Sequence, residues 1–470
     1  MSNQMIWEGI FSKPVHVEFT QKKTTSDAGL IIANAEIKRF DLCGRISDAI
    51  PDNRNQLFVI HRQKEQVQQR ILQLVAGYAD LNDAATLRKD PAFTTLVLEE
   101  KNQAFEKMKI SKKKLKKMKK EKQTDLSSAP TLCRFENRFD RASVKKLVRL
   151  QVQLYLERNK KRFKEILDRG APLEIAIDMD PTDLETHGQQ SLAFYNGHYG
   201  HTAYLPLVIA DGDNGDLIAA IPRPGNRHAT WMLKAILMGL IKYILKTYPQ
   251  AQFKIRADSG FQKESFFKFI EQHPQIQTAT ISIAFNRSLE KLTKNAVTEF
   301  NLAFEQNPDL NLLHFGEVGY RADSWSKYRR IIYQIAKTHY GATEIRYYMT
   351  LDLTSTPEQV KLDYNRRADA ENRIKEWKTQ SFAQRVSGET FMVNAFRMLI
   401  SGFAFIVLQE IQKKLIHTPL EHSYVATIRE KLIKVAGIFK ESTRRILLIL
   451  PESYPYQNIW RHLIAENCVT

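Results

Sequence analysis

Acidic residues at the ends of two apolar stretches are the first positions in this sequence that could do chemistry. Asp178 and Asp180 close LEIAIDMD, and Asp258 closes the apolar part of FKIRADSGF. Because side chains two residues apart in a strand point to the same face, alternation alone does not separate Asp178 from Asp180. A carboxylate at the end of a buried strand needs a hydrogen-bond donor or a cation beside it. A metal site would meet that need; a hydrogen-bonded strand end, or an N-cap at Asp258, is the simpler alternative.

The stretch DYNRRADAENRIKEWK, residues 363–378, supplies a third acid, Glu371, in a segment that we expect to be one helix. At about 100° per residue, the side chains that share one face within about 60° are Tyr364, Arg367, Glu371 and Lys378. Such a row could combine a metal ligand with groups that hold phosphates. A solvated face of ion pairs produces the same pattern and remains the alternative.

Together the acids predict a site for a hard divalent cation. Asp180, Asp258 and Glu371 offer the carboxylate oxygens that Mg²⁺ prefers, and Mn²⁺ is expected to substitute for it. Asp178 stays open as an alternative ligand. Two such ions about 3.5–4 Å apart can activate an attacking oxygen and stabilise the leaving one in phosphodiester cleavage. The residue types therefore favour an enzyme that cuts or transfers nucleic-acid strands.

The elements that must position these acids follow from the hydrophobic pattern. Short apolar stretches rich in β-branched residues predict strands, and longer stretches with helical spacing predict helices. The predicted strands are 173–180, 201–212, 216–225, 251–260 and 278–286, and the predicted helices are 229–248 and 261–273. Strands first, then helix and strand in alternation, argue for an α/β fold with a mixed sheet flanked by helices.

Changes of composition along the chain predict five segments. The first is basic and mostly helical and is expected to bind DNA, the third is β-rich, aromatic and basic and looks like an insertion, and the last is helical. The second and fourth form the two parts of the catalytic core, and Glu371 lies in the fourth. The segments are 1–165, 166–289, 290–352, 353–410 and 411–470.

The charge balance points to a polyanionic partner. The 470 residues include 70 Lys and Arg against 52 Asp and Glu, which gives a net charge of +18. This excess favours nucleic acid. No apolar stretch reaches the ~20 residues of a membrane span, so no membrane contact and a cytosolic location are expected. His187, His198 and His201 lack the spacing of a zinc site and are expected to be structural.

At this point the sequence resembles a known family, the DDE transposases of bacterial insertion sequences. More narrowly, it resembles the cut-and-paste branch, whose RNase H-like core is interrupted by a β-rich insertion. An Asp-x-Thr at Asp180-Pro181-Thr182 and the second acid, Asp258 in RADSGF, match the family's pattern. The Thr spacing favours Asp180 over Asp178 as the first acid. The branch's signature of Tyr, Arg, Glu and Lys matches the row on the expected helix, and the resemblance covers residues 60–410.

The resemblance implies roles for these residues. Asp180, Asp258 and Glu371 would hold two Mg²⁺ ions while water, and then the freed 3′-hydroxyl, attacks phosphodiester bonds. Trp325 would stack on a flipped base, as an aromatic residue of the insertion does in relatives that form a hairpin, and ordinary packing is its alternative. Outside the lysine-rich run 101–122, the residues expected to contact DNA are Tyr364, Arg367, Lys378, Trp325, Arg329 and Arg330.

The implied partners are the terminal inverted repeats of the element and the target DNA, with a homodimer in the synaptic complex. The implied location is the bacterial cytoplasm, at the nucleoid. One alternative is an RNase H-like nuclease or resolvase that cleaves without joining strands. Another is a domesticated, non-catalytic DNA-binding protein. The three acids argue against the second alternative, because binding alone does not require carboxylates that face DNA phosphates.

The lysine-rich run from 101 to 122 gives a first test. It holds eleven lysines, among them Lys112, Lys113, Lys116 and Lys117, which either contact phosphates or form a solvated loop. If they contact phosphates, replacing several lysines from Lys112 to Lys120 with alanine should flatten the dependence of log affinity on log salt. The slope should fall by about 0.9 for each phosphate that is no longer neutralised. A slope that stays unchanged supports the solvated loop.

Overall fold

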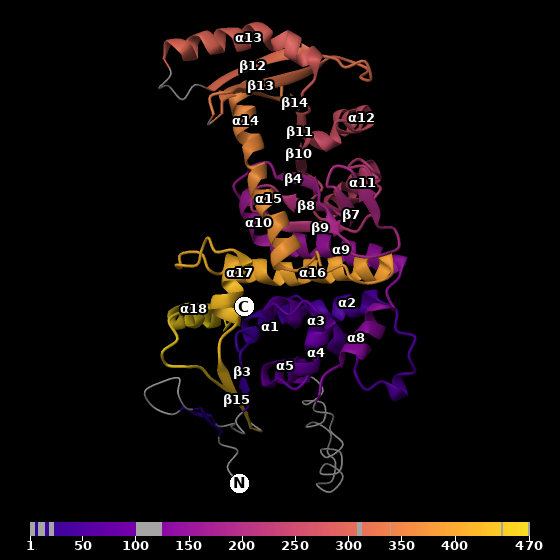
Figure 1. Cartoon of the computed structure of the whole chain (residues 1–470), viewed down its shortest axis with the longest axis vertical. Coiled ribbons are helices and arrows are strands. Elements are labelled where there is room, and N and C mark those ends of the chain that lie inside the picture. Colours follow the sequence, from indigo (N-terminus) through magenta and orange to yellow (C-terminus); the bar gives the residue numbers. More distant parts are fainter. Residues whose placement is uncertain are drawn as a thin grey trace. The chain divides into compact units, whose positions relative to one another are not determined.

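The computed structural model describes residues 5–7, 15–17, 23–99, 125–307, 313–338, 340–442 and 445–468. The chain divides into two compact units (Figure 1). The first unit takes residues from both ends of the chain, 1–43, 54–133 and 410–470, and the second comprises 44–53 and 134–409. All the candidate metal-binding acids lie in the second unit. The lysines between Lys112 and Lys120 lie outside the described residues. The five predicted segments divide the chain more finely and stay a prediction.

The first unit is mostly helical and carries small sheets. Strands β15 and β3 pair antiparallel, which joins chain segments more than four hundred positions apart. The C-terminal region, predicted as helical, thus also contains strands, because GIFKE and ILLI are short and rich in β-branched and aromatic residues. The longer helices are α1 (Leu30–Arg39), α3 (Gln63–Ala76), α5 (Pro91–Val97) and α18 (Gln457–Cys468), and the strands are β1 (Met5–Trp7), β2 (Val15–Val17), β3 (Thr24–Thr25), β15 (Gly437–Glu441) and β16 (Ile446–Ile449).

The second unit is built on an eight-stranded sheet in the order β12-β13-β14-β11-β10-β4-β8-β9. Strand β10 runs parallel to both β4 and β11, and every other neighbouring pair is antiparallel. The strands are β4 (Glu174–Pro181), β8 (Leu207–Asp211), β9 (Leu217–Ile221), β10 (Gln252–Ala257), β11 (Ile276–Ile283), β12 (Leu313–Tyr320), β13 (Arg329–Lys337) and β14 (Thr343–Thr350).

The predicted fold class is confirmed. Strands β9, β8, β4, β10 and β11 form a mixed sheet with the first strand, β4, at its centre, and helices flank it, as the RNase H-like prediction requires. One predicted strand is in fact two. The stretch 201–212 divides at Pro206 into β7 (His201–Tyr204) and β8, because proline has no N–H for a continuous ladder. Strand β7 joins a separate small sheet with β5 (Leu184–Glu185) and β6 (Phe194–Asn196).

The predicted insertion extends the core sheet. Strand β14 pairs antiparallel with β11, and β13 and β12 continue the same sheet outward. The segment also opens with a helix that the pattern did not predict, α13 (Arg287–Gln306), which begins at Asn286 as a side-chain N-cap. The insertion is therefore attached to the core through backbone hydrogen bonds as well as through its two chain connections.

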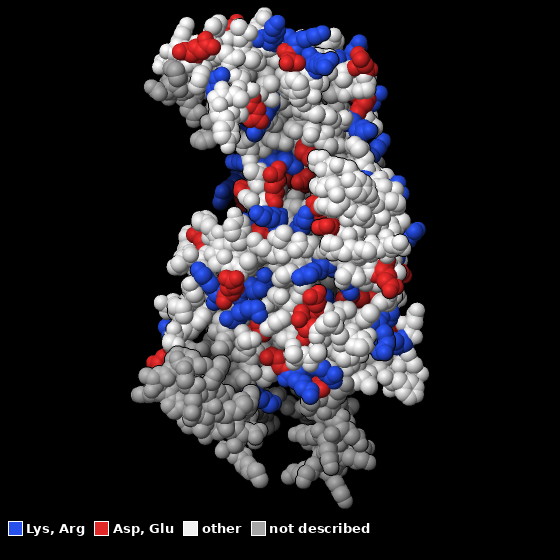
Figure 2. Space-filling view, viewed as in Figure 1, with Lys and Arg blue, Asp and Glu red and all other residues white. Residues whose placement is uncertain are grey.

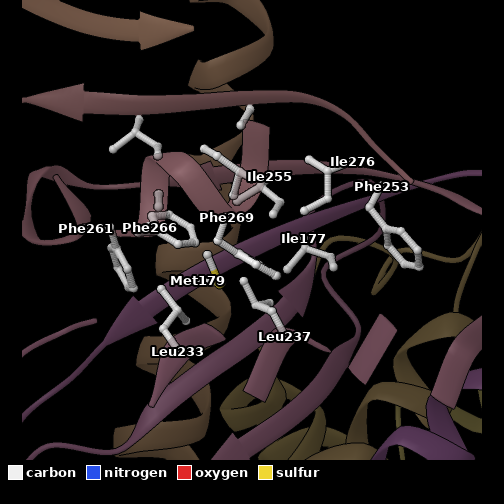
Figure 3. Close-up of a cluster of buried hydrophobic side chains, with 14 of the residues drawn as sticks. Ile177, Met179, Leu233, Leu237, Phe253, Ile255, Phe261, Phe266, Phe269 and Ile276 are labelled. Carbon is white, nitrogen blue, oxygen red and sulfur yellow. The ribbon is translucent and has the colours of Figure 1, made fainter. Parts of the chain in front are cut away.

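One face of the central strands is buried under two helices, α11 (Leu233–Leu245) and α12 (Glu264–Gln272). Figure 3 shows Ile177 and Met179 of β4 close to Leu233 and Leu237 of α11 within one hydrophobic cluster. Because strand side chains alternate, Asp178 and Asp180 point to the other face. The hydrophobic pattern of β4 thus fixes which face carries the acids.

The segment that carries Glu371 is not one straight helix. It consists of α14 (Pro357–Asn365), α15 (Arg367–Lys375) and a π-helical turn, η4 (Glu376–Gln380), before the long helix α16 (Phe391–Lys413). Helix α16 is long and apolar enough to cross a membrane by composition, but 89% of its most apolar window is buried in the protein. A helix that is apolar on all sides is typical of a protein core.

The core predicts a contrast between two leucines of the second unit. Leu237 on α11 is fully buried, whereas Leu292 on α13 is half exposed. Leu237→Ala should lower the free energy of unfolding by about 2–5 kcal/mol, because it leaves a cavity beside β4. Leu292→Ala should change it by no more than about 0.5 kcal/mol. Urea titrations followed by circular dichroism measure both, and equal effects would contradict this packing.

Candidate active site

The register of two parallel strands brings Asp180 and Asp258 together. Arg256 lies beside Asp178 and Ala257 beside Met179 across the β4–β10 pair. Continuing both strands by one residue places Asp258 next to Asp180, at the carboxyl ends where sites of α/β sheets gather. Asp258 turns the chain there, since its Oδ1 accepts a hydrogen bond from the N–H of Gly260 at 3.0 Å.

Asp178 faces the same side but is engaged elsewhere. The guanidinium of Arg256 donates from Nε to Asp178 Oδ1 at 2.7 Å and from Nη2 to Oδ2 at 2.9 Å, and both side chains are only 1% exposed. Nη2 also donates to the carbonyl of Gly212, where a Cβ atom would lie 2.0 Å from Nη2. With both oxygens paired to Arg256, Asp178 belongs to a buried structural pair, and Asp180 remains the candidate for the first acid.

Helix α15 supplies the third acid and a cation between the acids. Arg367 lies 3.3 Å from Asp180 (Nη2 to Oδ1) and donates from Nη1 to Glu371 Oε1 at 2.5 Å. The side chain of Arg367 is largely buried, whereas that of Glu371 is exposed. Figure 2 shows acidic and basic side chains intermixed on the surface where Figure 1 places α15. One guanidinium therefore links an acid of β4 to the acid of the helix.

The charges of the three acids act on one another. Burial raises the pKa of Asp180 to about 7, the charge of Arg367 opposes this shift, and the charges of Asp258 and Glu371 add to it. Burial also raises the pKa of Asp258, against the charge of Arg367 and the hydrogen bond from Gly260. The charges of the neighbouring acids thus add to the effect of burial, and Arg367 offsets these shifts only in part.

The predicted stripe on the helix holds in part. Tyr364 donates from its hydroxyl to the carbonyl of Ala257, at 3.3 Å, and its ring packs against Tyr348 with centroids 4.7 Å apart. Tyr364 therefore touches the strand that carries Asp258. Lys378 lies within the π-helical turn, where residues advance by less than about 100° each, and it donates from Nζ to Asp183 Oδ1 at 2.6 Å. A count over one regular helix could not have predicted that partner.

Asp183 is a residue of the site that the sequence patterns did not indicate. It accepts hydrogen bonds from Lys378 and from His201, whose Nε2 lies 2.9 Å from Asp183 Oδ2. Burial opposes a low pKa for Asp183, but the hydrogen bonds from Lys378 and His201 outweigh it and lower the pKa. Asp183 follows Asp180 by three residues, just beyond the strand end, and this position could have indicated that it lies near the site.

Trp325, expected to stack on a flipped base, is packed against helix α12 of the core. Trp325 is only 8% exposed and lies edge-on to Phe267, with centroids 5.1 Å apart. Arg329 covers it and is paired with Glu264 and Glu271. Arg330 is paired with Glu317. The structure thus favours ordinary packing for Trp325, because no face of its ring is open to a base.

The donor set suits a hard divalent cation. Asp180, Asp258 and Glu371 interact electrostatically with one another, and Arg367 pairs with Asp180 and Glu371. Within the part of the chain that the structure describes, no three His, Cys, Asp or Glu side chains have the spacing of a preformed metal site. Chemically the three acids fit Mg²⁺ or Mn²⁺, on the condition that Arg367 yields its place.

Comparisons with known proteins give a family match and a similar solved structure. A family model described as "Transposase DDE domain group 1" matches residues 8–467. No match is found among curated proteins. Among solved structures, the chain is similar to a piggyBac transposase, seen by cryo-EM in its synaptic complex with hairpin DNA. That similarity has a TM-score of 0.42 and 10% sequence identity, over 88% of this chain and 83% of the other.

The raised pKa of Asp180 predicts a pH effect on stability in metal-free protein. From about pH 4 to pH 7 the folded protein keeps a proton on Asp180 that the unfolded chain has lost, so stability falls as the pH rises through this range. Asp180→Asn should remove this contribution. In EDTA, raising the pH from 5 to 8 should lower the melting temperature of the wild type more than that of the variant. The two decreases should differ by several degrees, because 1 kcal/mol corresponds to about 2–4 °C in a large domain.

Asp323→Asn serves as the matched control, since Asp323 is an exposed carboxylate of the same unit. Its melting temperature should follow that of the wild type at both pH values. A wild-type pH dependence that persists in Asp180→Asn would show that Asp180 is not the titrating group.

Proposed function

The chain belongs to the family of DDE transposase domains, group 1, and from that premise we propose that it is the transposase of a bacterial insertion sequence. In this proposal it cleaves the ends of the element and joins them to target DNA. Members of this family are enzymes of the nuclease and transferase type that act on DNA with divalent metal ions. The net charge of +18 fits a DNA partner.

The observation that carries the proposal is the meeting of three acids at one end of the sheet. Asp180, Asp258 and Glu371 interact electrostatically with one another and with Arg367, although they come from three elements far apart in the sequence. Structure alone gives no reason to gather three carboxylates around one cation, because their repulsion costs stability. A site that must hold cations and phosphates gives that reason.

In the proposed enzyme Asp180, Asp258 and Glu371 hold Mg²⁺, and Mn²⁺ substitutes for it. Cations in such a site supply activation of the attacking oxygen and stabilisation of the leaving oxygen. The chain's own contribution is to fix three carboxylates at strand ends and on α15. Arg367 leaves the acids and contacts a DNA phosphate beside them, for which its planar guanidinium is well suited.

Lys378 and Tyr364 support the DNA beside the acids. Lys378 extends from the turn after α15 and can exchange its partner Asp183 for a phosphate, since its side chain is partly exposed. Tyr364 keeps α14 against the end of β10 through the carbonyl of Ala257. The basic N-terminal region, 1–165, supplies further DNA contacts, and two copies of the chain act on the two ends of one element.

An RNase H-like nuclease that cleaves without joining is the alternative function. Both activities need the same three acids, so the site geometry does not separate them. A strand-transfer assay does: purified protein, Mg²⁺ and end DNA from the inverted repeats that flank the gene are incubated with a target plasmid. With pre-cleaved ends, joined products support the transposase, and cleavage of uncut ends without joining supports the nuclease.

Glu371 gives the sharpest single substitution. Glu371→Gln keeps the shape of the side chain but removes the charge that a divalent cation needs. Cleavage of end DNA should therefore fall by at least about a hundredfold, measured by gel under single-turnover conditions. Binding of the same DNA, measured by fluorescence anisotropy, should persist because the basic surface is unchanged.

Glu358→Gln is the matched control, because Glu358 is exposed on α14 and lies outside the site. It should cleave like the wild type. Undiminished cleavage by Glu371→Gln would overturn the assignment of the third acid.

A further inference from the structure

A hairpin outside the three acidic segments carries Tyr199, which interacts electrostatically with Asp180 and Asp258. Strands β6 and β7 pair antiparallel, and residues 197–200 form the turn between them. The turn is closed by a hydrogen bond from the N–H of Gly200 to the carbonyl of Asn196, at 2.8 Å, and Gly200 has the positive φ of 76° that glycine favours. Asn196 Oδ1 also accepts from the N–H of His198, at 3.0 Å. The tip is thus a defined turn.

Aromatic contacts hold Tyr199 at this tip. Its ring lies edge-on to His198, with centroids 4.8 Å apart, and stacks on His201 at 6.0 Å. His201 is anchored by Asp183, which also accepts from Lys378. The position of Tyr199 is therefore tied to the loop after Asp180 and to the turn after α15.

Tyr199 lies within electrostatic range of the acids. Burial raises the pKa of Tyr199 to about 12, and the charges of Asp183, Asp180 and Asp258 add to the shift. The phenol is therefore neutral at physiological pH and available as a donor. The neighbouring His198 acts electrostatically on Asp258. The hairpin tip thus brings a hydroxyl donor to the same acids that α15 approaches with Arg367.

A buried arginine lies near this phenol with an unused donor. Arg223 is fully buried and donates from Nε to the carbonyl of Leu205, at 2.8 Å, and from Nη1 to that of Ala229, at 3.0 Å. Its Nη2 has no hydrogen-bond partner in the described structure. Burial lowers the pKa of Arg223 to about 10, against the influence of Tyr199, so the group is still charged at pH 7. A buried cation without a carboxylate partner favours an anion at the adjacent surface.

We propose that Tyr199 is a further DNA-contacting residue of the enzyme: its hydroxyl donates a hydrogen bond to a non-bridging oxygen of a backbone phosphate beside the acids, and Arg223 favours that phosphate through its charge. The proposal rests on the proposed function, because it places DNA at this site. It concerns one hydroxyl group, since the ring of Tyr199 already has a packing role between His198 and His201.

Tyr199→Phe separates the hydroxyl from the ring. The variant keeps the aromatic contacts and should melt at the wild-type temperature. Its affinity for pre-cleaved end DNA, measured by anisotropy in Mg²⁺ with Glu371→Gln as the common background to prevent turnover, should fall roughly tenfold, because the variant cannot donate a hydrogen bond to the charged phosphate. Tyr195→Phe is the matched control, because Tyr195 is exposed on β6 of the same hairpin. The affinity of this variant for the end DNA should equal that of the parent.

A scan of single methylphosphonates along the end DNA then identifies the phosphate that Tyr199 contacts. At one phosphate the neutral substitution should weaken binding by the parent protein about as much as Tyr199→Phe does, and should weaken binding by the Phe variant no further. Additive losses of affinity at every phosphate, or an affinity of Tyr199→Phe equal to that of the parent, would overturn the proposal.

Failure of this proposal and failure of the proposed function give different results. If the wild-type chain neither cuts nor joins end DNA, the proposed function fails. If the wild type cuts and joins, and Tyr199→Phe binds every DNA like its parent, only the contact by Tyr199 fails.

Discussion

The organisation of the second unit depends on one electrostatic constraint: three carboxylates meet at the end of a sheet and must be offset by positive charge. In this structure Arg367 offsets part of their charge, 3.3 Å from Asp180 and hydrogen-bonded to Glu371. The balance is incomplete, as the raised pKa of Asp180, caused by burial and by the neighbouring acids, shows. In the proposed enzyme a divalent cation would supply the missing positive charge, and Arg367 would then be free to contact a phosphate.

The remainder of the fold holds this arrangement in place. The parallel register of β4 and β10 sets Asp180 beside Asp258, and the buried pair of Asp178 and Arg256 ties the two strands together two residues earlier. Gly212 is required because a side chain there would collide with Arg256. On the opposite face, the hydrophobic cluster under α11 and α12 buries the apolar side chains of the strands and so fixes which face each strand presents (Figure 3). Hydrophobic packing on one face of the sheet thus fixes the positions of the acids on the other.

Local patterns sufficed to predict the strands that end in Asp180 and Asp258 and the mixed sheet they build, because hydrophobic alternation is written into each stretch. They did not predict the pairing of Lys378 with Asp183, 195 positions away, because Lys378 lies in a π-helical turn and not on the regular helix that was expected. Nor did they predict that Asp178 pairs with Arg256. The arginine lies two residues before Asp258, as Asp178 lies two residues before Asp180, and this spacing could have indicated the pair. The burial of Trp325 could not be predicted from local patterns either, because it depends on tertiary contacts with Phe267 and Arg329.

The most direct measurement of the central claim is anomalous diffraction from crystals of the full chain soaked in Mn²⁺. We expect a peak within bonding distance of Asp180, Asp258 or Glu371, with the guanidinium of Arg367 moved away from Asp180. We expect no peak at Asp178, whose oxygens stay on Arg256. A peak elsewhere, or Arg367 unmoved with the acids empty at saturating Mn²⁺, would contradict the account.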